Sequence, residues 1–299
     1  MKIIFVGPRF EHPRTGGEFH ISTVLHYLSA AGVEIQLLEQ PHEGTFNNFL
    51  CNNVRDFYRL TRVSGLEGKV LVGPYSRRFH LVLFNWLVRS TMDVRIVGLV
   101  HAFYFSHRQS ALKNTVDRFV SRLFLSALDM IIAGGQAAAE ELSAMGVASK
   151  KIRVVYPALR RQFRNNRSRI ATKWKANGRT VMLFVGRVNR IKGLECLLDA
   201  LQILRDYHTV SLVVVGDRSR DPLYAHAVAD RIQRAGMESI VEFRGRVEEV
   251  ERLIDIYRSA HIFLLPSLWE TSPVSLLEAM CFGLPIVASD VGGIPEYLG

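Results

Sequence analysis

Short apolar runs alternate with stretches of helical periodicity along most of the chain. In the first half, the runs that suit buried strands are residues 2–7, 33–39, 69–72, 93–100, 130–133 and 152–155. Residues 18–31 separate the first two runs and place Ile21, Val24, Leu25 and Leu28 on one helical stripe. This alternation is typical of parallel strands joined by helices.

The second half repeats the same alternation. Strands are predicted at residues 180–185, 210–215, 240–243, 262–265 and 285–288, and helices at 193–207, 223–235, 247–260 and 273–282. The fold class that this pattern predicts is α/β, with two Rossmann-like, doubly wound parallel sheets.

Residues 157–178 interrupt the pattern, because they are polar, strongly basic and closed by Asn-Gly. We interpret them as an interdomain linker between an N-terminal domain, residues 1–156, and a C-terminal domain, residues 179–299. A chain of 299 residues is long enough for two domains of about 150 residues each. A ligand is then expected in the cleft between the domains, at the carboxyl ends of the strands.

Composition narrows the protein class. The cysteines Cys51, Cys196 and Cys281 are far apart and form no Cys/His cluster, which disfavours a disulfide framework or a zinc site. No secretory signal pattern or apolar run of membrane-spanning length occurs, so a cytoplasmic protein is expected. The net charge of +10 fits an anionic partner: nucleic acid, anionic membrane lipid or a phosphorylated substrate.

Several phosphate-binding signatures are absent from the sequence. No two glycines are spaced G-x-G and no GxxxxGK[ST] loop occurs, which excludes the dinucleotide and P-loop fingerprints. No two aspartates are spaced D-x-D, so the usual carboxylate pair for a metal–diphosphate complex is missing. A bound diphosphate would have to be neutralised by backbone amides and by Arg or Lys.

The segment after residues 262–265 offers such groups. Ser272 is a suitable N-cap and Pro273 a suitable first helical residue, which would leave amides near residues 274–276 facing a phosphate. Glu270 precedes this helix and Glu278 lies inside it, so two carboxylates could flank one ligand. Each glutamate taken alone could equally be a solvated surface charge.

The same segment carries a resemblance to a known family. Glu270 and Glu278 are spaced E-x7-E, and EAM-x-x-G-x-P-I-V-A-S-x-x-G-G-x-x-E follows from Glu278. Together with LFVGRVNRIKGLECLLDAL at residues 183–201, this string resembles the retaining GT-B glycosyltransferases of family 4. The likeness covers nearly all of residues 180–299. In the first half, TGGEFHISTVLHYLSAAGVEI and LVHAF are similar to the family more loosely.

The resemblance implies roles for particular residues of the second domain. Arg187 and Lys192 would neutralise the diphosphate of the donor, and Ser272 would belong to the same donor site. Glu278 would hold the ribose hydroxyls and Glu270 the transferred sugar. Solvated loop charges are the alternative for Arg187 and Lys192.

In the first domain, the resemblance implies that Gly16 and Gly17 let a loop approach the phosphate closely. His101 would lie beside the sugar, on the acceptor side, and the resemblance implies a catalytic role for His101 and Glu270. The alternatives are a simple turn for the glycines and a core position for the histidine.

The chain also departs from the family pattern. Thr271 follows Glu270 where the family often has glycine, which would tighten or shift the sugar pocket. The sequence stops at Gly299, whereas family members usually continue for several tens of residues, so the C-terminal domain is expected to be truncated.

The implied activity is transfer of a sugar from an NDP-sugar to a hydroxyl acceptor, lipid-linked, polysaccharide or small glycan, with retention of configuration. No metal or other cofactor is expected, since the NDP-sugar is a co-substrate. Alternatives are an epimerase or phosphorylase on the same fold, or a truncated, non-catalytic nucleotide-binding module. Aromatic and basic residues do not gather in the pattern of nucleic-acid binding, so nucleic acid is not expected as a partner.

Residues 107–129 suggest where an acceptor could be reached. Apolar positions interleave there with Lys113, Arg118 and Arg122, as in helices that lie on anionic membranes. A peripheral position on the inner membrane face would fit a cell-envelope acceptor. An ordinary helix with a solvated outer face is the alternative.

Overall fold

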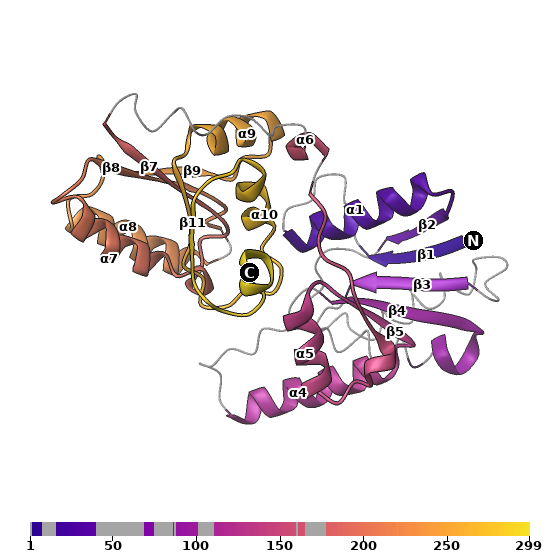
Figure 1. Cartoon of the computed structure of the whole chain (residues 1–299). Helices are drawn as coiled ribbons and strands as arrows, with labels where there is room; N and C mark the ends of the chain where they lie inside the picture. The colour runs from indigo at the N-terminus through magenta and orange to yellow at the C-terminus, as the bar shows by residue number, and fades with distance from the viewer. Residues whose placement is uncertain are drawn as a thin grey trace. The chain divides into compact units, whose positions relative to one another are not determined.

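The computed structural model describes residues 2–7, 16–39, 69–74, 86–100 except 87, 111–164 except 160, and 178–299 except 220. Two compact units make up the chain, Met1–Ala158 and Leu159–Gly299, and both are drawn in Figure 1. Each unit contains one parallel sheet with helices packed on it. The predicted class, α/β with two doubly wound parallel sheets, is confirmed.

The first unit contains a six-stranded parallel sheet in the order β2-β1-β3-β4-β5-β6. Its strands are β1 (Lys2–Gly7), β2 (Glu34–Glu39), β3 (Lys69–Pro74), β4 (Val94–Val100), β5 (Met130–Ala133) and β6 (Ile152–Val154). Its helices include α1 (Gly16–Ala30), α4 (Ala111–Ser126), α5 (Gln136–Ala144) and the short 3-10 helix η2 (Ser149–Lys151).

Side chains of the first sheet alternate between two apolar clusters, as the period of two in a strand requires. Ile3 and Phe5 belong to the cluster that contains Ile21 of α1. Ile4 belongs to the other cluster, with Phe124 and Leu125 of α4. The near-continuous apolar strands are thus explained by burial on both faces.

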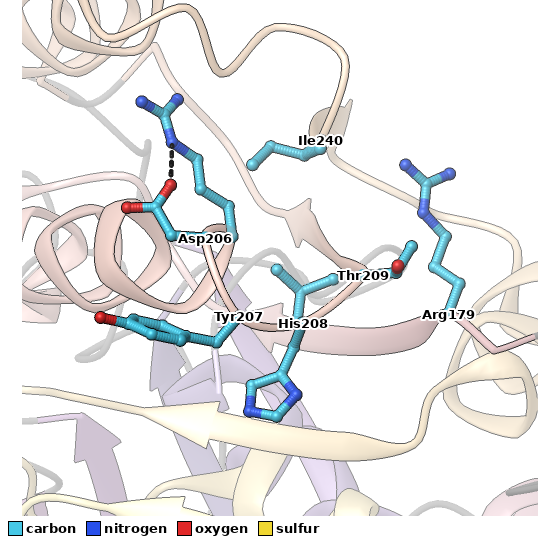
Figure 2. Close-up of a pocket in the computed structure, with 8 residues that line it drawn as sticks. Arg179, Asp206, Tyr207, His208, Thr209 and Ile240 are labelled. Atoms are coloured by element: carbon cyan, nitrogen blue, oxygen red, sulfur yellow. Dashed lines mark ion pairs between the residues drawn. The ribbon is translucent and has the colours of Figure 1, made fainter.

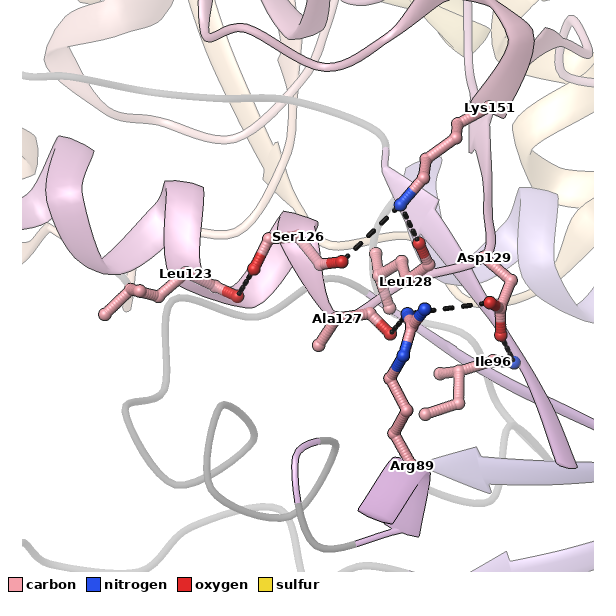
Figure 3. Close-up of polar contacts among 8 residues, drawn as sticks. All are labelled: Arg89, Ile96, Leu123, Ser126, Ala127, Leu128, Asp129 and Lys151. Carbon is pink, nitrogen blue, oxygen red and sulfur yellow. Dashed lines mark hydrogen bonds and ion pairs between the residues drawn. The ribbon is translucent and has the colours of Figure 1, made fainter. Parts of the chain in front are cut away.

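The C-terminal end of α4 is anchored by two cations, as Figure 3 shows. Lys151 donates to the carbonyl oxygens of Leu128 at 2.8 Å and Ser126 at 3.5 Å, and Arg89 donates to that of Ala127 at 3.2 Å. Positive charge is favourable at a helix C-terminus because the last carbonyls carry partial negative charge. These contacts fix α4 on the first sheet.

The second unit contains a five-stranded parallel sheet in the order β11-β10-β7-β8-β9. Its strands are β7 (Thr180–Val185), β8 (Val210–Val215), β9 (Val241–Gly245), β10 (Ile262–Leu265) and β11 (Ile286–Ala288). Its helices are α6 (Arg161–Arg164), η4 (Arg190–Lys192), α7 (Leu194–Leu204), α8 (Pro222–Arg234), α9 (Val250–Ser259), α10 (Val274–Cys281) and α11 (Pro295–Leu298).

Two apolar clusters cover the faces of this sheet. Met182 and Phe184 of β7 pack with α7 and α8, whereas Leu183 between them packs with α9 and α10. Phe163 of α6 is fully buried in the second cluster. Part of the segment that we interpret as a linker, residues 157–178, is therefore a packed element of the second unit.

The strand order positions the site. From β7 the chain adds β8 and β9 on one side, and it then crosses to the other side to add β10 and β11. β7 and β10 are hydrogen-bonded neighbours at this crossover. Loops leave such a point in opposite directions, and in open α/β sheets the crevice outside the strands' carboxyl ends is where ligands bind.

Candidate functional site

The loops that follow β7 and β10 lie against each other at the crossover. The amide of Leu268 donates to the carbonyl oxygen of Ile191 at 2.7 Å. Gly193 adopts a left-handed conformation, φ 64°, and a Cβ there would lie 2.1 Å from the carbonyl oxygen of Pro266. Only glycine allows this approach, which explains why the loop needs Gly193 directly after Lys192.

Lys192 and Glu270, both predicted as donor-site residues, form an ion pair between Nζ and Oε1. The hydroxyl of Ser267 donates to the same Oε1 at 2.9 Å, and Ser267 is fully buried. No residue in the part of the chain that the structure describes donates to Oε2 of Glu270. Glu270 is thus held through one carboxylate oxygen while the other remains able to accept a hydrogen bond.

A third loop, after β11, supports Glu270 from its backbone side. The amide of Gly293 donates to the carbonyl oxygen of Glu270 at 2.9 Å. Gly292 has φ 54°, and a Cβ on it would lie 1.9 Å from that same oxygen. The G-G pair of the sequence is therefore a packing requirement, because it lets the β11 loop touch the backbone of Glu270.

Glu278, the second predicted carboxylate, lies on the buried side of α10 and is 4% exposed. Its Oε2 accepts a hydrogen bond of 2.8 Å from the hydroxyl of Tyr257 on α9. Neither Tyr257 nor Ser267 could be identified as a site residue from the sequence. The contact of Tyr257 with Glu278 joins two elements that only the fold brings together, and the contact of Ser267 with Glu270 depends on the conformation of the loop after β10.

The start of α10 differs from the prediction. The helix begins at Val274 with Pro273 as its N-cap, and no side chain caps it. The predicted N-cap role of Ser272 is therefore wrong, because the extended backbone of Pro273, φ −75° and ψ 95°, shifts the helix start by one residue. Leu276 already donates to the carbonyl of Pro273 at 3.1 Å, so the amides at the open helix start are those of Val274 and Ser275.

The cations on the β7 loop have different surroundings. Arg187 is exposed. The guanidinium of Arg190 instead lies over the ring of Tyr224 on α8, 5.9 Å from its centroid. Burial, and then the hydrogen bond that the phenol donates to Glu195, raise the pKa of Tyr224 well above its usual range. Arg187 and Arg190 are both exposed, so this loop presents two cations to solvent, of which Arg190 lies over the Tyr224 ring.

Two buried polar atoms on these loops lack a hydrogen-bond partner within the described residues. They are Oδ1 of Asn189, between Arg187 and Lys192 in the sequence, and Nε1 of Trp269, next to Glu270. Buried polar atoms usually have a partner, so these two mark places where a ligand or water would complete the site.

Of the site residues predicted in the first unit, the two glycines lie within the described residues and the histidine does not. Gly16 and Gly17 are the first two residues of α1, two positions ahead of the predicted helix start. This places the G-G pair at the start of the helix that follows strand β1. His101 lies outside the described residues, and its assignment stays a prediction.

A separate groove of about 420 Å³ lies at the opposite edge of the second sheet, as Figure 2 shows. Its lining includes Arg179, Tyr207, His208 and Thr209, which precede β7 and β8 in the chain. None of the predicted site residues lines it. We place the candidate site at the carboxyl edge, because the Lys192–Glu270 ion pair lies on loops there and α10, with its open start and the buried Glu278, follows directly.

Among the described helices, none is both long and apolar enough to cross a bilayer. Within the described ranges, no three His, Cys, Asp or Glu side chains lie close enough together to hold a metal ion.

With this geometry in place, comparison with known proteins identifies the class. The family model described as Glycosyltransferase Family 4 matches residues 14–162, and the model described as Glycosyl transferases group 1 matches residues 179–299. The chain therefore belongs to the GT-B glycosyltransferases of group 1 and family 4.

Two curated relatives illustrate the likeness. The "Uncharacterized 41.2 kDa protein in cps region" of Klebsiella pneumoniae is 26% identical over 222 residues, which are 72% of this chain and 58% of the relative. The amylovoran biosynthesis glycosyltransferase AmsK of Erwinia amylovora is 32% identical over 167 residues, which are 53% of this chain and 38% of AmsK. The aligned part thus spans roughly half of such relatives or less.

Among solved structures, HepE of Anabaena in complex with UDP and glucose has a TM-score of 0.72 and 17% identity. The match covers 99% of this chain and 82% of that one. At this level of identity the likeness shows the GT-B fold alone.

Proposed function

We propose that the protein transfers a sugar from an NDP-sugar to a hydroxyl acceptor with retention of configuration. The observation that carries this proposal is the Lys192–Glu270 pair at the β7–β10 crossover, with Glu278 on the helix that follows. A cation for the diphosphate and two carboxylates for hydroxyl groups are then available at one sheet edge, on its loops and on α10. Such a set suits a ligand that is anionic at one end and rich in hydroxyls elsewhere.

The donor's diphosphate would be neutralised by Arg187 and Lys192. The ammonium of Lys192 has three N–H donors, so it can keep its bond to Glu270 and still meet a phosphate oxygen. The amides of Val274 and Ser275, at the start of α10, would add partial positive charge.

The two carboxylates would bind the donor's hydroxyls. Glu278 would accept from the ribose, and Glu270 would accept from the transferred sugar through Oε2. HepE, whose structure contains UDP, shares the fold, which makes UDP-sugars the first donors to test.

In the reaction, the bond between the anomeric carbon and the diphosphate oxygen breaks as a new bond to the acceptor oxygen forms on the same face of the sugar. The acceptor's proton passes to the departing phosphate oxygen, and the nucleoside diphosphate leaves. The protein contributes position and charge: Arg187 and Lys192 would stabilise the charge that grows on the leaving group. We propose that His101 lies at the sugar on the first-unit side.

A donor screen with product analysis tests the proposal. UDP-, GDP- and ADP-sugars are incubated with the chain and candidate hydroxyl acceptors, and the products are examined by mass spectrometry and anomeric proton NMR. We expect a glycosylated acceptor with the donor's anomeric configuration. Isomerised donor without transfer would point to an epimerase. Release of sugar phosphate that depends on added phosphate would point to a phosphorylase. Binding without turnover would point to a non-catalytic module.

We further propose that transfer needs no metal ion. The sequence lacks a D-x-D pair, and Arg187 and Lys192 would supply the positive charge that a metal ion otherwise brings to a diphosphate. Turnover is therefore expected to persist in excess EDTA. Loss in EDTA with recovery on addition of Mn²⁺ would contradict this part of the proposal.

For the acceptor, we propose a glycan or lipid-linked glycan of the cell envelope, reached at an anionic membrane surface. Two relatives carry names from this context: AmsK, of amylovoran biosynthesis, and the Klebsiella protein of the cps region. The surface of α4 provides the physical argument. Phe119 and Leu123, four residues apart on this helix, are 61% and 43% exposed.

The outer face of α4 combines these apolar side chains with positive charge. Arg118 and Arg122 are also exposed and are spaced by one helical turn. The opposite face, with Phe124 and Leu125, is buried on the sheet. A helix anchored on one side, with aromatic, aliphatic and Arg side chains on the other, suits an anionic lipid surface. Figure 3 shows the Leu123 side chain directed away from the anchoring cations.

Vesicle sedimentation tests this surface. Vesicles with anionic phosphatidylglycerol should bind the protein more tightly than neutral phosphatidylcholine vesicles, and added salt should weaken the binding. Reversing Arg118 and Arg122 to Glu should lower the affinity roughly thirtyfold or more, since each basic residue contributes about 1 kcal/mol. The matched control reverses the exposed Arg234 and Arg252 of the second unit. Equal loss in both variants would mean that only net charge matters.

A further inference from the structure

The hydroxyl of Tyr257 contacts two groups at the candidate site. The hydroxyl donates to Oε2 of Glu278 at 2.8 Å and lies 3.3 Å from the carbonyl oxygen of Ser275. Ser275 is the second residue of α10, and Glu278 lies almost one turn further on. A single phenol on α9 therefore contacts both the start of α10 and the carboxylate inside it.

The ring of Tyr257 is fixed by aromatic packing. It is stacked on Phe282, with centroids 5.3 Å apart and planes 3° apart. Phe163 meets it edge to face at 5.9 Å, and Phe263 lies tilted at 6.1 Å. Tyr257 is fully buried, so its hydroxyl has one well-defined position. A donor fixed in this way can orient a carboxylate without losing rotamer entropy on ligand binding.

A hydrogen-bond donor matters at Glu278, because this carboxylate is buried on the side of α10 that carries an apolar cluster. The cluster on this side of the sheet includes Leu276, Ala279 and Phe282 of the same helical segment. A carboxylate in such a place is costly unless it accepts hydrogen bonds. A bond from a phenol favours the ionised form, which is the form that accepts hydrogen bonds from two ribose hydroxyls.

We infer that Tyr257 is a positioning residue of the donor site. It acts through Glu278: it directs that carboxylate to where a ribose would lie, and its contact with Ser275 ties this orientation to the start of α10. The inference rests on the proposed function, in which Glu278 binds the ribose of the donor. Tyr257 itself does not touch the donor.

Tyr257→Phe removes the hydroxyl and keeps the ring. We expect the affinity for UDP, or for whichever of GDP and ADP the wild type binds, to fall about tenfold by calorimetric titration. Turnover at saturating donor should change less than twofold, since the ribose contact is equal in ground and transition states. A double-mutant cycle with Glu278→Gln should show strong non-additivity, with the double variant binding about as weakly as Glu278→Gln alone.

Leu253→Ala is the matched control. It removes a buried apolar side chain of α9 from the same cluster and keeps Tyr257 stacked on Phe282, so it should lower the melting temperature and leave nucleotide affinity within about twofold. A second measurement keeps the hydroxyl in place. With 3-fluorotyrosine incorporated at position 257, the ¹⁹F resonance should shift on addition of the nucleotide. That shift should be lost in Glu278→Gln.

The outcomes separate the two proposals. If the wild type binds a nucleotide and Tyr257→Phe binds it equally well, or if the two substitutions simply add, Tyr257 is only a core residue and the inference is wrong while the proposed function stands. A silent ¹⁹F resonance at saturating nucleotide would overturn it in the same way. A wild type that binds none of the three nucleotides would overturn the proposed function, and this inference with it.

Discussion

The ammonium of Lys192 donates a hydrogen bond to Oε1 of Glu270, and this ion pair joins the loop after β7 to the loop after β10. The two side chains are only 15% and 10% exposed. In the sequence they are 78 residues apart, and they meet because the strand order places β7 and β10 side by side. The pair is thus a direct consequence of the crossover in the sheet.

Removing the cation of this pair should be costly for stability. Lys192→Ala leaves the carboxylate of Glu270 buried with Ser267 as its remaining partner, and we expect a loss of about 3 kcal/mol in the free energy of unfolding. Urea denaturation measures it. The control, Arg258→Ala, breaks the exposed pair with Asp255 and should cost less than about 1 kcal/mol. Equal losses would mean that the Lys192 pair is solvated.

Gly292 should tolerate no side chain, for a reason beyond its conformation. Gly292→Ala and Gly236→Ala place alanine at nearly equal φ, 54° and 58°, but only the first brings a Cβ against the carbonyl of Glu270. Both substitutions force alanine to adopt a positive φ, which costs of order 1 kcal/mol. Any further loss of stability in Gly292→Ala, compared with Gly236→Ala, therefore measures the clash with the carbonyl of Glu270. Donor affinity should also fall in that variant alone. Matching losses in stability and affinity would remove the argument for a close approach.

Tyr224 should make stability depend on pH in the alkaline range. Its raised pKa means that the fold favours the neutral phenol, so this contribution is complete below the unfolded value near 10 and is lost as pH rises beyond it. Between pH 9 and 11.5, wild-type stability should therefore fall more steeply than that of Tyr224→Phe, by of order 1 kcal/mol per pH unit above pH 10. Parallel pH profiles from chemical denaturation would show that the phenol is unperturbed.

Arg187 and Glu278 should act on different parts of the donor. Arg187 would meet a diphosphate whose charge grows as the bond to the sugar breaks, so Arg187→Ala should lower turnover more than donor affinity. Steady-state kinetics beside calorimetric affinities separates the two effects. Arg190→Ala is the control on the same loop, because Arg190 lies over Tyr224. A purely proportional loss of affinity in Arg187→Ala would make it a ground-state contact.

Strands were the most predictable part of this fold. The predicted bounds of β1, β5, β7, β8 and β10 agree with the structure to the residue, because these strands are short apolar runs closed by polar residues, glycine or proline. Helix ends were less predictable. The segment predicted as a helix over residues 193–207 forms α7 only from Leu194 to Leu204, since local turns replace the helix beyond it.

The site could be predicted only as a set of residues. Spacing and resemblance identified Lys192, Glu270 and Glu278, but their pairings depend on which strands become neighbours. Tyr257 lies within the helix predicted over residues 247–260, and nothing local in the sequence indicates that its hydroxyl meets Glu278. The burial of Phe163 on α6 was not predictable either, because this residue lies within a strongly basic stretch of the sequence.

Titration of one nucleoside diphosphate tests the central claim, that the donor binds at the carboxyl edge of the second sheet. The nucleotide preferred in the donor screen is titrated into the wild type, Glu278→Ala and Tyr207→Ala, the last of which alters the groove at the opposite edge. We expect saturable binding that Glu278→Ala weakens about ten- to a hundredfold, through loss of a bond worth roughly 1.5–3 kcal/mol, and that Tyr207→Ala leaves unchanged. Binding that survives in a folded Glu278→Ala and is lost in Tyr207→Ala would contradict the account.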